Sequence, residues 1–150
     1  MTGTTTTSTA DLTEQAARLR LAINRMARRL RQEANTDLGP ASIAALATIE
    51  RTGPLTPSEL ARIEGIQRPT ATRILSRLTD EGYVTRTADP TDGRSAIVDC
   101  SPEGRAALTR LRKRKTAYLA KQMRKLPDED VETLARAAEI LEQVLEEGRS

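Results

Sequence analysis

The sequence predicts a mainly α-helical fold that carries one small β-hairpin. Three observations support this fold. Apolar residues recur at helical spacing through both ends of the chain, two short helical segments meet at a glycine, and two strand-like runs flank a loop that contains Pro and Gly. A chain of 150 residues is long enough for one ordinary domain with a buried core. We therefore expect one domain over residues 11–148, preceded by a Thr-rich disordered tail at residues 1–10.

The first long helix is predicted within residues 11–37. Its apolar residues are spaced by three or four positions and form one continuous stripe, which consists of Leu12, Ala16, Leu19, Ile23, Met26 and Leu30. The arginines of this helix fall outside the stripe, which indicates a basic, solvated face. A small lobe cannot cover an apolar stripe of this length, so we expect a second apolar surface to pack on it.

Shorter elements are predicted over residues 38–101. A second helix begins near Pro40 and ends near Gly53, because both residues interrupt the helical pattern. A third helix follows, and the hydroxyl of Thr56 or Ser58 is suited to cap its first turn.

A fourth helix and a hairpin complete this central part. Gly65 provides a turn between the third and fourth helices, and the fourth runs over about residues 67–81. Gly82 is placed to end it in a left-handed cap. Strands are then expected at residues 83–86 and 96–100, on either side of a turn-rich loop.

Two further helices are predicted over residues 103–148. Residues 101–103 combine a capping hydroxyl, a proline at the first helical position and a carboxylate in the first turn. Pro127 separates the two helices, and three acidic residues open the last one at its positive dipole end. Both carry apolar stripes, formed by Leu108, Leu111, Leu119, Met123 and Leu126, and by Val131, Leu134, Ala138, Leu141 and Leu145.

The composition excludes most catalytic and metal-binding chemistry. There is no His, Phe or Trp, and the one cysteine, Cys100, can form neither an internal disulfide nor a cysteine cluster for a metal. Without a nucleophile and base pair we expect no enzyme activity, no cofactor and no metal site. Cys100 is expected to be a small buried residue with an inert thiol rather than a redox sensor.

Residues 2–9 carry neither the basic nor the apolar region typical of a secretory leader, so we expect none, and no apolar run approaches the ~18 residues needed to span a bilayer. We therefore expect a cytoplasmic protein that makes no contact with a membrane.

Two helices joined by a glycine turn and followed by a hairpin form a winged helix-turn-helix pattern. The second of these helices has no acidic residue between Gly65 and Thr79, and Arg is the side chain best suited to guanine edges and phosphates. Double-stranded DNA is therefore the expected partner. The expected contacts from the helices are Thr56, chiefly a helix cap, and Gln67, Arg68, Thr70, Thr72, Arg73 and Arg77.

Four segments in and around this pattern carry a specific combination of residues. They read LTPSELA at 55–61, RPTATR at 68–73, LTDEGYVTR at 78–86 and DPTDGRS at 89–95. With these motifs the chain resembles the MarR-type (multiple antibiotic resistance regulator) transcription factors over residues 12–147.

The resemblance implies a role for the tip of the hairpin. The wing, residues 87–96, would place Arg94 in the minor groove of DNA, and Asp92 would orient this arginine. Arg86 is expected to pair with Asp89 or Asp92 rather than to contact DNA.

The resemblance also implies a homodimer in which the first, fifth and sixth helices intertwine, and the uncovered apolar stripes independently favour it. The expected interface residues are Leu12, Leu19, Ile23, Leu111, Leu119, Leu134, Leu141 and Leu145, and Tyr118 is expected in the dimer core. The implied function is a repressor that binds a pseudo-palindromic operator; the effector, if one exists, is unknown. A winged-helix adaptor that binds proteins and not DNA is the alternative function, against which the acid-free fourth helix argues.

Overall fold

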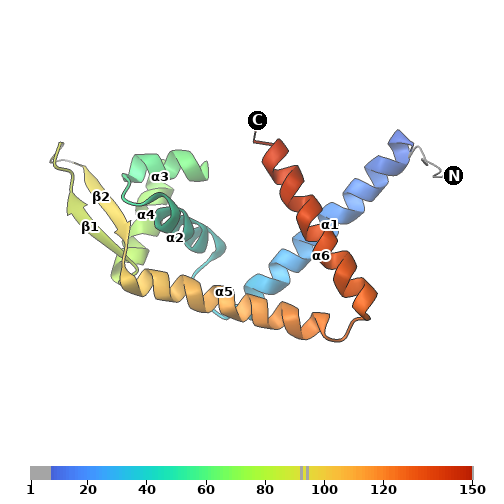
Figure 1. The fold of residues 1–150 in the computed structure, drawn as a ribbon. Helices are drawn as coiled ribbons and strands as arrows, with labels where there is room; N and C mark the ends of the chain where they lie inside the picture. Colours follow the sequence, from blue (N-terminus) through green and yellow to red (C-terminus); the bar gives the residue numbers. More distant parts are fainter. Residues whose placement is uncertain (1–7, 92, 94, 150) are drawn as a thin grey trace.

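The computed structural model describes residues 8–91, 93 and 95–149. It contains six helices and two strands in these residues (Figure 1). In chain order they are α1 (Thr9–Glu33), α2 (Pro40–Thr52), α3 (Pro57–Glu64), α4 (Arg68–Asp80), β1 (Val84–Ala88), β2 (Ala96–Cys100), α5 (Pro102–Met123) and α6 (Asp128–Glu147). The elements from α2 to β2 form a lobe at one end of α5, while α1 and α6 stand away from it at the other end (Figure 1).

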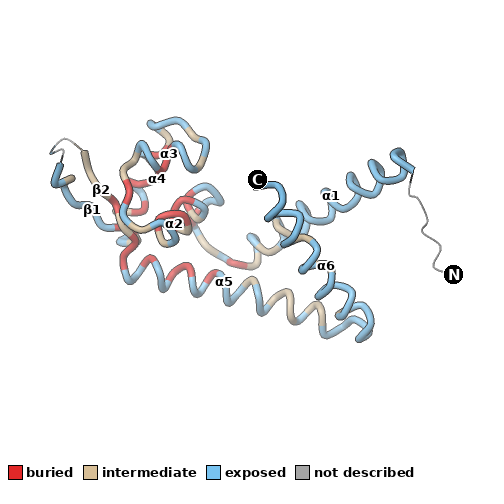
Figure 2. Tube along the Cα trace, turned by 45° about the horizontal axis from the view of Figure 1, so that its top comes forward, coloured by how far each residue is buried: buried red, intermediate tan, exposed pale blue. Residues whose placement is uncertain are grey.

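The hydrophobic core lies in the lobe. Its fully buried large side chains come from every helix of the lobe and from β2, and they are Leu46, Ile49, Leu60, Leu75, Leu78 and Val98. Figure 2 shows that buried residues are concentrated in this lobe and in the first half of α5. The lobe therefore has a core of its own that holds α4 in place.

Local signals in the sequence explain the helix-turn-helix formed by α3 and α4. Thr56 caps α3 in a capping box, in which its hydroxyl accepts from the Glu59 amide and the Glu59 carboxylate accepts from the Thr56 amide. Gly65 ends α3 in the left-handed region with φ of 64°, a conformation that favours glycine. Gly82, with φ of 77°, reverses the chain after α4 as expected.

The hairpin pairs β1 with β2 in antiparallel register from Val84 opposite Cys100 to Ala88 opposite Ala96. The first strand thus begins one residue later and ends two residues later than the sequence pattern predicts. Leu55, which precedes α3, adds a bridge to the sheet by exchanging two backbone hydrogen bonds with Val98. This bridge attaches the base of the wing to the start of the helix-turn-helix.

The first half of α5 belongs to the core of the lobe. Ser101 caps the helix as expected, and Gly104, Ala107, Leu108 and Leu111 are buried. The lobe therefore extends past the expected boundary at residue 101. Leu111, expected at the dimer interface, is only 5% exposed within its own chain and therefore packs on its own lobe.

Neither α1 nor α6 has a buried residue. Their exposed large apolar side chains include Leu12 (58% exposed), Leu19, Ile23, Leu134 and Leu145 (71% exposed). The helix α1 begins at Thr9, so residues 9 and 10, expected in a disordered tail, are helical, with Ser8 at the N-cap position. The rest of the expected tail, residues 1–7, lies outside the described residues.

Within residues 8–91, 93 and 95–149, no helix is both long and apolar enough to cross a membrane. The same residues contain no group of three or more acidic or Cys side chains that could hold a metal ion.

Candidate nucleic-acid interface

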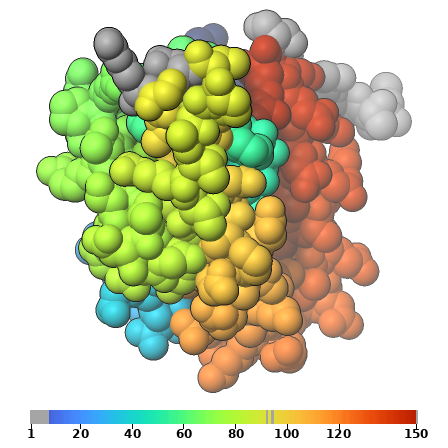
Figure 3. Space-filling view, turned by 90° about the vertical axis from the view of Figure 1, so that its left-hand side faces the viewer, coloured from blue at the N-terminus to red at the C-terminus, as the bar shows by residue number. Residues whose placement is uncertain are grey.

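The helix α4 exposes one polar face along its length. It buries Ala71, Ile74, Leu75 and Leu78 against the lobe, so the residues between them point outward. Thr72, Arg73, Ser76 and Arg77 are all exposed. Figure 3 shows this side of the molecule, where the green atoms of α4 lie beside the yellow-green atoms of β1.

Most polar side chains on this face have no partner within the described part of the chain. Gln67 occupies the N-cap position of α4 without a side-chain capping bond. Arg68 and Arg73 form no ion pair, and no acidic residue precedes Asp80 in this helix. Thr70 and Thr72 are on the same helix, and their hydroxyls add donors suited to phosphate oxygens. The face therefore presents positive charge and hydrogen-bond donors that the folded protein leaves available.

Arg77 differs from the other arginines of α4. Its Nη2 atom donates a hydrogen bond to the backbone carbonyl of Asp37, at 2.9 Å. Asp37 lies in the segment that connects α1 with α2, so this guanidinium is engaged by the protein itself. The sequence gives no signal for this bond, because it joins residues 40 positions apart through a backbone atom.

Thr56 is occupied chiefly as a cap, as the sequence predicts, and it is half-buried. Thr56 precedes the first helix of the helix-turn-helix, whereas Arg77 lies in the last turn of the second.

The structure describes the wing, residues 87–96, except for residues 92 and 94. At its start, Asp89 accepts hydrogen bonds from the amide and the hydroxyl of Thr91 at 2.9 and 2.8 Å. The predicted DNA contact Arg94 and its predicted partner Asp92 lie outside the described residues. The expected Arg86–Asp89 ion pair is not formed: in the described part of the chain, Arg86 has no ion-pair partner and is exposed on β1.

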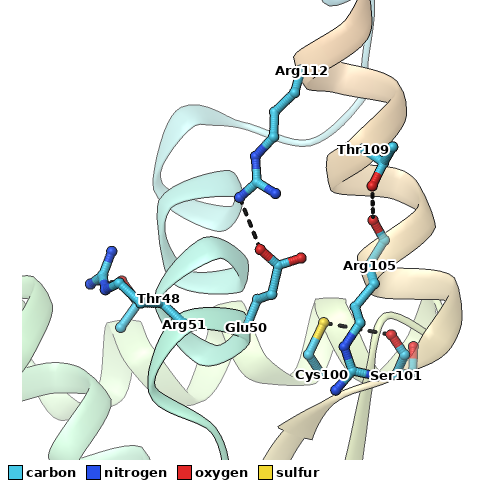
Figure 4. Close-up of polar contacts among 8 residues, drawn as sticks. All are labelled: Thr48, Glu50, Arg51, Cys100, Ser101, Arg105, Thr109 and Arg112. Atoms are coloured by element: carbon cyan, nitrogen blue, oxygen red, sulfur yellow. Dashed lines mark hydrogen bonds and ion pairs between the residues drawn. The ribbon is translucent and has the colours of Figure 1, made fainter.

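Cys100 is buried at the end of β2, and Figure 4 shows its sulfur directed toward the start of α5. The Sγ atom lies 3.5 Å from the Ser101 carbonyl, to which it can donate a weak hydrogen bond. Burial raises the pKa of the Cys100 thiol, with smaller contributions from Glu50 and Asp99, while Arg105 acts in the opposite direction. Both the burial and the raised pKa agree with the inert thiol that the sequence predicts.

Comparison with known proteins supports a regulator. The family model described as the MarR family matches residues 38–96. An HTH-type transcriptional regulator of Mycobacterium leprae is 30% identical over 133 residues, which cover 88% of this chain and 93% of the relative. The multiple antibiotic resistance protein MarR of Salmonella typhimurium is 31% identical over 106 residues, which cover 67% of this chain and 74% of that protein.

Solved structures agree with these relatives. The crystal structure of a putative transcriptional regulator of Pseudomonas aeruginosa matches with a TM-score of 0.81 and 31% identity, over 93% of this chain and 99% of that one. A mutant of S. aureus MepR, solved bound to an oligodeoxyribonucleotide, has the same fold, with a TM-score of 0.67 and 17% identity over 87% of this chain and 97% of that one. The chain belongs to the MarR family of transcriptional regulators, and its lobe is the DNA-binding winged helix of that family.

Proposed function

We propose that two copies of this chain bind one duplex at a pseudo-palindromic operator and repress transcription from it. The observation that carries this proposal is the outer face of α4, where Arg68, Arg73, Thr70 and Thr72 are free of partners in the described structure. An α-helix fits the major groove, and an arginine there can bond two acceptors of one guanine. Each lobe would place its α4 in one major groove.

The dimer would form through the apolar residues that α1 and α6 leave exposed. In the single chain, neither helix buries a residue, which is unusual for helices with continuous apolar stripes. The proposed interface residues are Leu12, Leu19 and Ile23 of α1, Leu119 of α5, and Leu134, Leu141 and Leu145 of α6. A symmetric pairing of these stripes would remove them from water.

The wing would add a second kind of contact. Residues 87–96 would approach the minor groove beside each major-groove contact, with Arg94 inserted and Asp92 orienting it. The two half-sites would lie about one helical turn, or ~10 bp, apart. Occupation of such a site at a promoter would block polymerase.

The proposal is tested by fluorescence anisotropy with a duplex found by footprinting the region upstream of the gene. We expect affinity to fall steeply as salt rises, because bound arginines release phosphate counterions. Arg73→Ala should weaken binding about 10-fold or more, as should Arg94→Ala, with the dimer intact. If the wild-type protein has no salt-dependent affinity for any duplex, the proposal is wrong and a protein-binding adaptor is favoured.

A further inference from the structure

The recognition helix is attached to the segment that leads out of α1. Residues 34–39 connect α1 with α2, and Arg77 in the last turn of α4 donates to the Asp37 carbonyl of this segment at 2.9 Å. The apolar face of α4 packs on α2, α3 and β1, and α1 packs on α5. The bond from Arg77 is therefore a direct link from α4 to the chain that joins the lobe with α1.

A second arginine holds the same segment from another side. Arg114 of α5 donates through Nη1 to the carbonyls of Ala34 and Asn35, at 3.0 and 3.2 Å. These carbonyls follow the last turn of α1, where a helix leaves acceptors unpaired and carries partial negative charge. A guanidinium at this end of α1 is therefore favourable both as a donor and as a charge.

The connecting segment turns sharply between two buried residues. Ala34 is fully buried and Leu38 is 7% exposed, while Asn35 between them has φ of 48°, in the left-handed region. A hollow of about 270 Å³ adjoins the segment and is lined by residues 35–38, Tyr83, Arg110 and Arg114, among others. Beside this hollow, the bonds from the two arginines and one from the Leu38 amide to the Thr36 hydroxyl, at 3.2 Å, fix the path of the backbone together with the burial of Ala34 and Leu38.

In Figure 3, blue atoms from the region where α1 ends lie below the green atoms of the lobe and beside the orange atoms of α5. Through these hydrogen bonds, three parts of the chain meet at this segment: the lobe with α4, the end of α1, and α5.

We propose that Arg77 and Arg114 form a clamp on residues 34–37 that sets the angle of the recognition helix relative to α1 and α5. This inference rests on the proposed function in one respect, namely that two lobes face one duplex. In such a dimer the clamp determines which spacing of half-sites the protein accepts. Arg77 is then a positioning residue, in contrast to Arg73, one turn earlier on the same face, which is a DNA contact.

The physical reason is geometric. Two recognition helices that read one face of a duplex must lie about 34–36 Å apart, one turn of DNA. In the chain, residues 34–39 link α1 to the lobe, and α5 links the lobe to α6. Without the clamp, residues 34–37 lose the side-chain hydrogen bonds that tie them to α4 and α5, and the burial of Ala34 and Leu38 and the packing of α1 on α5 are left to hold the angle between the lobe and α1.

The first test compares Arg77→Ala with Arg73→Ala as a matched variant on the same exposed face. The duplexes carry two half-sites at the footprinted spacing or one or two base pairs closer or farther apart, and one duplex carries a single half-site. We expect Arg77→Ala to reduce the preference for the footprinted spacing at least about threefold, with single half-site affinity and salt slope unchanged. Arg73→Ala should lower affinity at every spacing and reduce the salt slope by about one.

A conservative substitution at Arg77 gives a further way to tell a positioning residue from a residue that contacts DNA. Arg77→Lys keeps a positively charged donor but lacks the planar guanidinium that reaches the Asp37 carbonyl, so it should recover only part of the spacing preference. If Arg77→Ala instead behaves like Arg73→Ala, with weaker single half-site binding and a smaller salt slope, Arg77 is a DNA contact and the clamp is wrong.

The second test needs neither DNA nor a dimer. Nitroxide labels at Ser76→Cys on α4 and Arg18→Cys on α1, in a Cys100→Ala chain diluted with unlabelled protein, report the distance within one chain by double electron–electron resonance. We expect a narrow distribution that broadens in Arg77→Ala and broadens further when Arg114→Ala is added. An unchanged width in the double variant would contradict the clamp, whereas failure of the wild type to bind DNA would contradict only the proposed function.

Discussion

The guanidinium of Arg29 lies over the ring of Tyr118, with its central carbon 5.3 Å from the ring centroid. The Nε atom of the same arginine donates to the Tyr118 hydroxyl at 3.1 Å, and its Nη2 atom forms an ion pair with Glu33 at 2.7 Å. These contacts join α1 to α5 at a point outside the lobe. Tyr118, which the sequence places in a dimer core, thus has a definite role within its own chain.

Removal of the ring should therefore loosen α1 from α5. We expect Tyr118→Ala to lower the melting temperature more than Tyr118→Phe, because phenylalanine retains the cation–π contact and loses only the hydrogen bond. Differential scanning calorimetry at one protein concentration measures the melting temperatures of both variants. Equal effects of the two variants would show that the ring itself contributes nothing to the contact.

Gly104 near the start of α5 is expected to tolerate no side chain. A Cβ atom there would lie 2.2 Å from the Tyr83 carbonyl oxygen and 3.0 Å from the Cys100 Sγ atom. Although alanine normally favours a helix over glycine, this clash involves backbone, so Gly104→Ala should cost about 3 kcal/mol. Urea unfolding of the wild type and the variant measures this difference in the free energy of unfolding.

Gly39→Ala is the matched control for this substitution, because a Cβ atom at Gly39 meets nothing within 4 Å. Because Gly39 is the N-cap of α2, where alanine is less favourable than glycine, we expect this control to cost no more than about 1 kcal/mol. A Gly104→Ala protein as stable as Gly39→Ala would contradict the close approach of the Tyr83 carbonyl to the start of α5.

The raised pKa of the Cys100 thiol predicts a dependence of stability on pH. The folded protein favours the neutral thiol, so the unfolded chain ionises first, near the ordinary pKa of 9.0. The stabilisation that the Cys100 thiol gives to the folded protein is complete below the pKa of the unfolded chain. It is lost as the pH rises through the raised pKa of the folded protein. Urea unfolding at pH about 7 and about 10 should thus show a larger loss for the wild type than for Cys100→Ala. An equal loss in both proteins would contradict this account of Cys100.

The sequence predicts the lobe well because its signals are local. The capping box at Thr56 and the positive φ angles of Gly65 and Gly82 each determine an element end within a few residues. Leu111 shows the limit of this reasoning. Its spacing in α5 gives an apolar stripe, but periodicity cannot tell whether a stripe packs on its own lobe or on another chain.

In the candidate site, too, some features can be predicted from local sequence signals and others cannot. The outward face of α4 follows from helical periodicity, because Ala71, Ile74, Leu75 and Leu78 identify the buried side. The bond from Arg77 to Asp37 does not follow from any pattern, since a backbone carbonyl accepts irrespective of its side chain. The bridge between Leu55 and Val98 has no sequence signal for the same reason, because it is formed by backbone groups.

Charged residues in the stripe of α6 should disrupt the proposed dimer. Leu134→Glu places a carboxylate at a side chain that is 44% exposed in the single chain, and burial against a partner would be costly. We expect dissociation into single chains with the lobe intact, seen by light scattering and circular dichroism. Ile63→Glu on α3, at a site 42% exposed outside the stripes, is the control that should remain a dimer. A dimeric Leu134→Glu protein would remove α6 from the interface.

The central claim is that two α4 helices of a dimer engage one duplex together. Sedimentation equilibrium of the protein with a footprinted duplex, at low ionic strength, tests this claim most directly. The account predicts a complex with the mass of two chains and one duplex, which dissociates as salt is added. One chain per duplex, or a protein that sediments apart from the DNA, would contradict it.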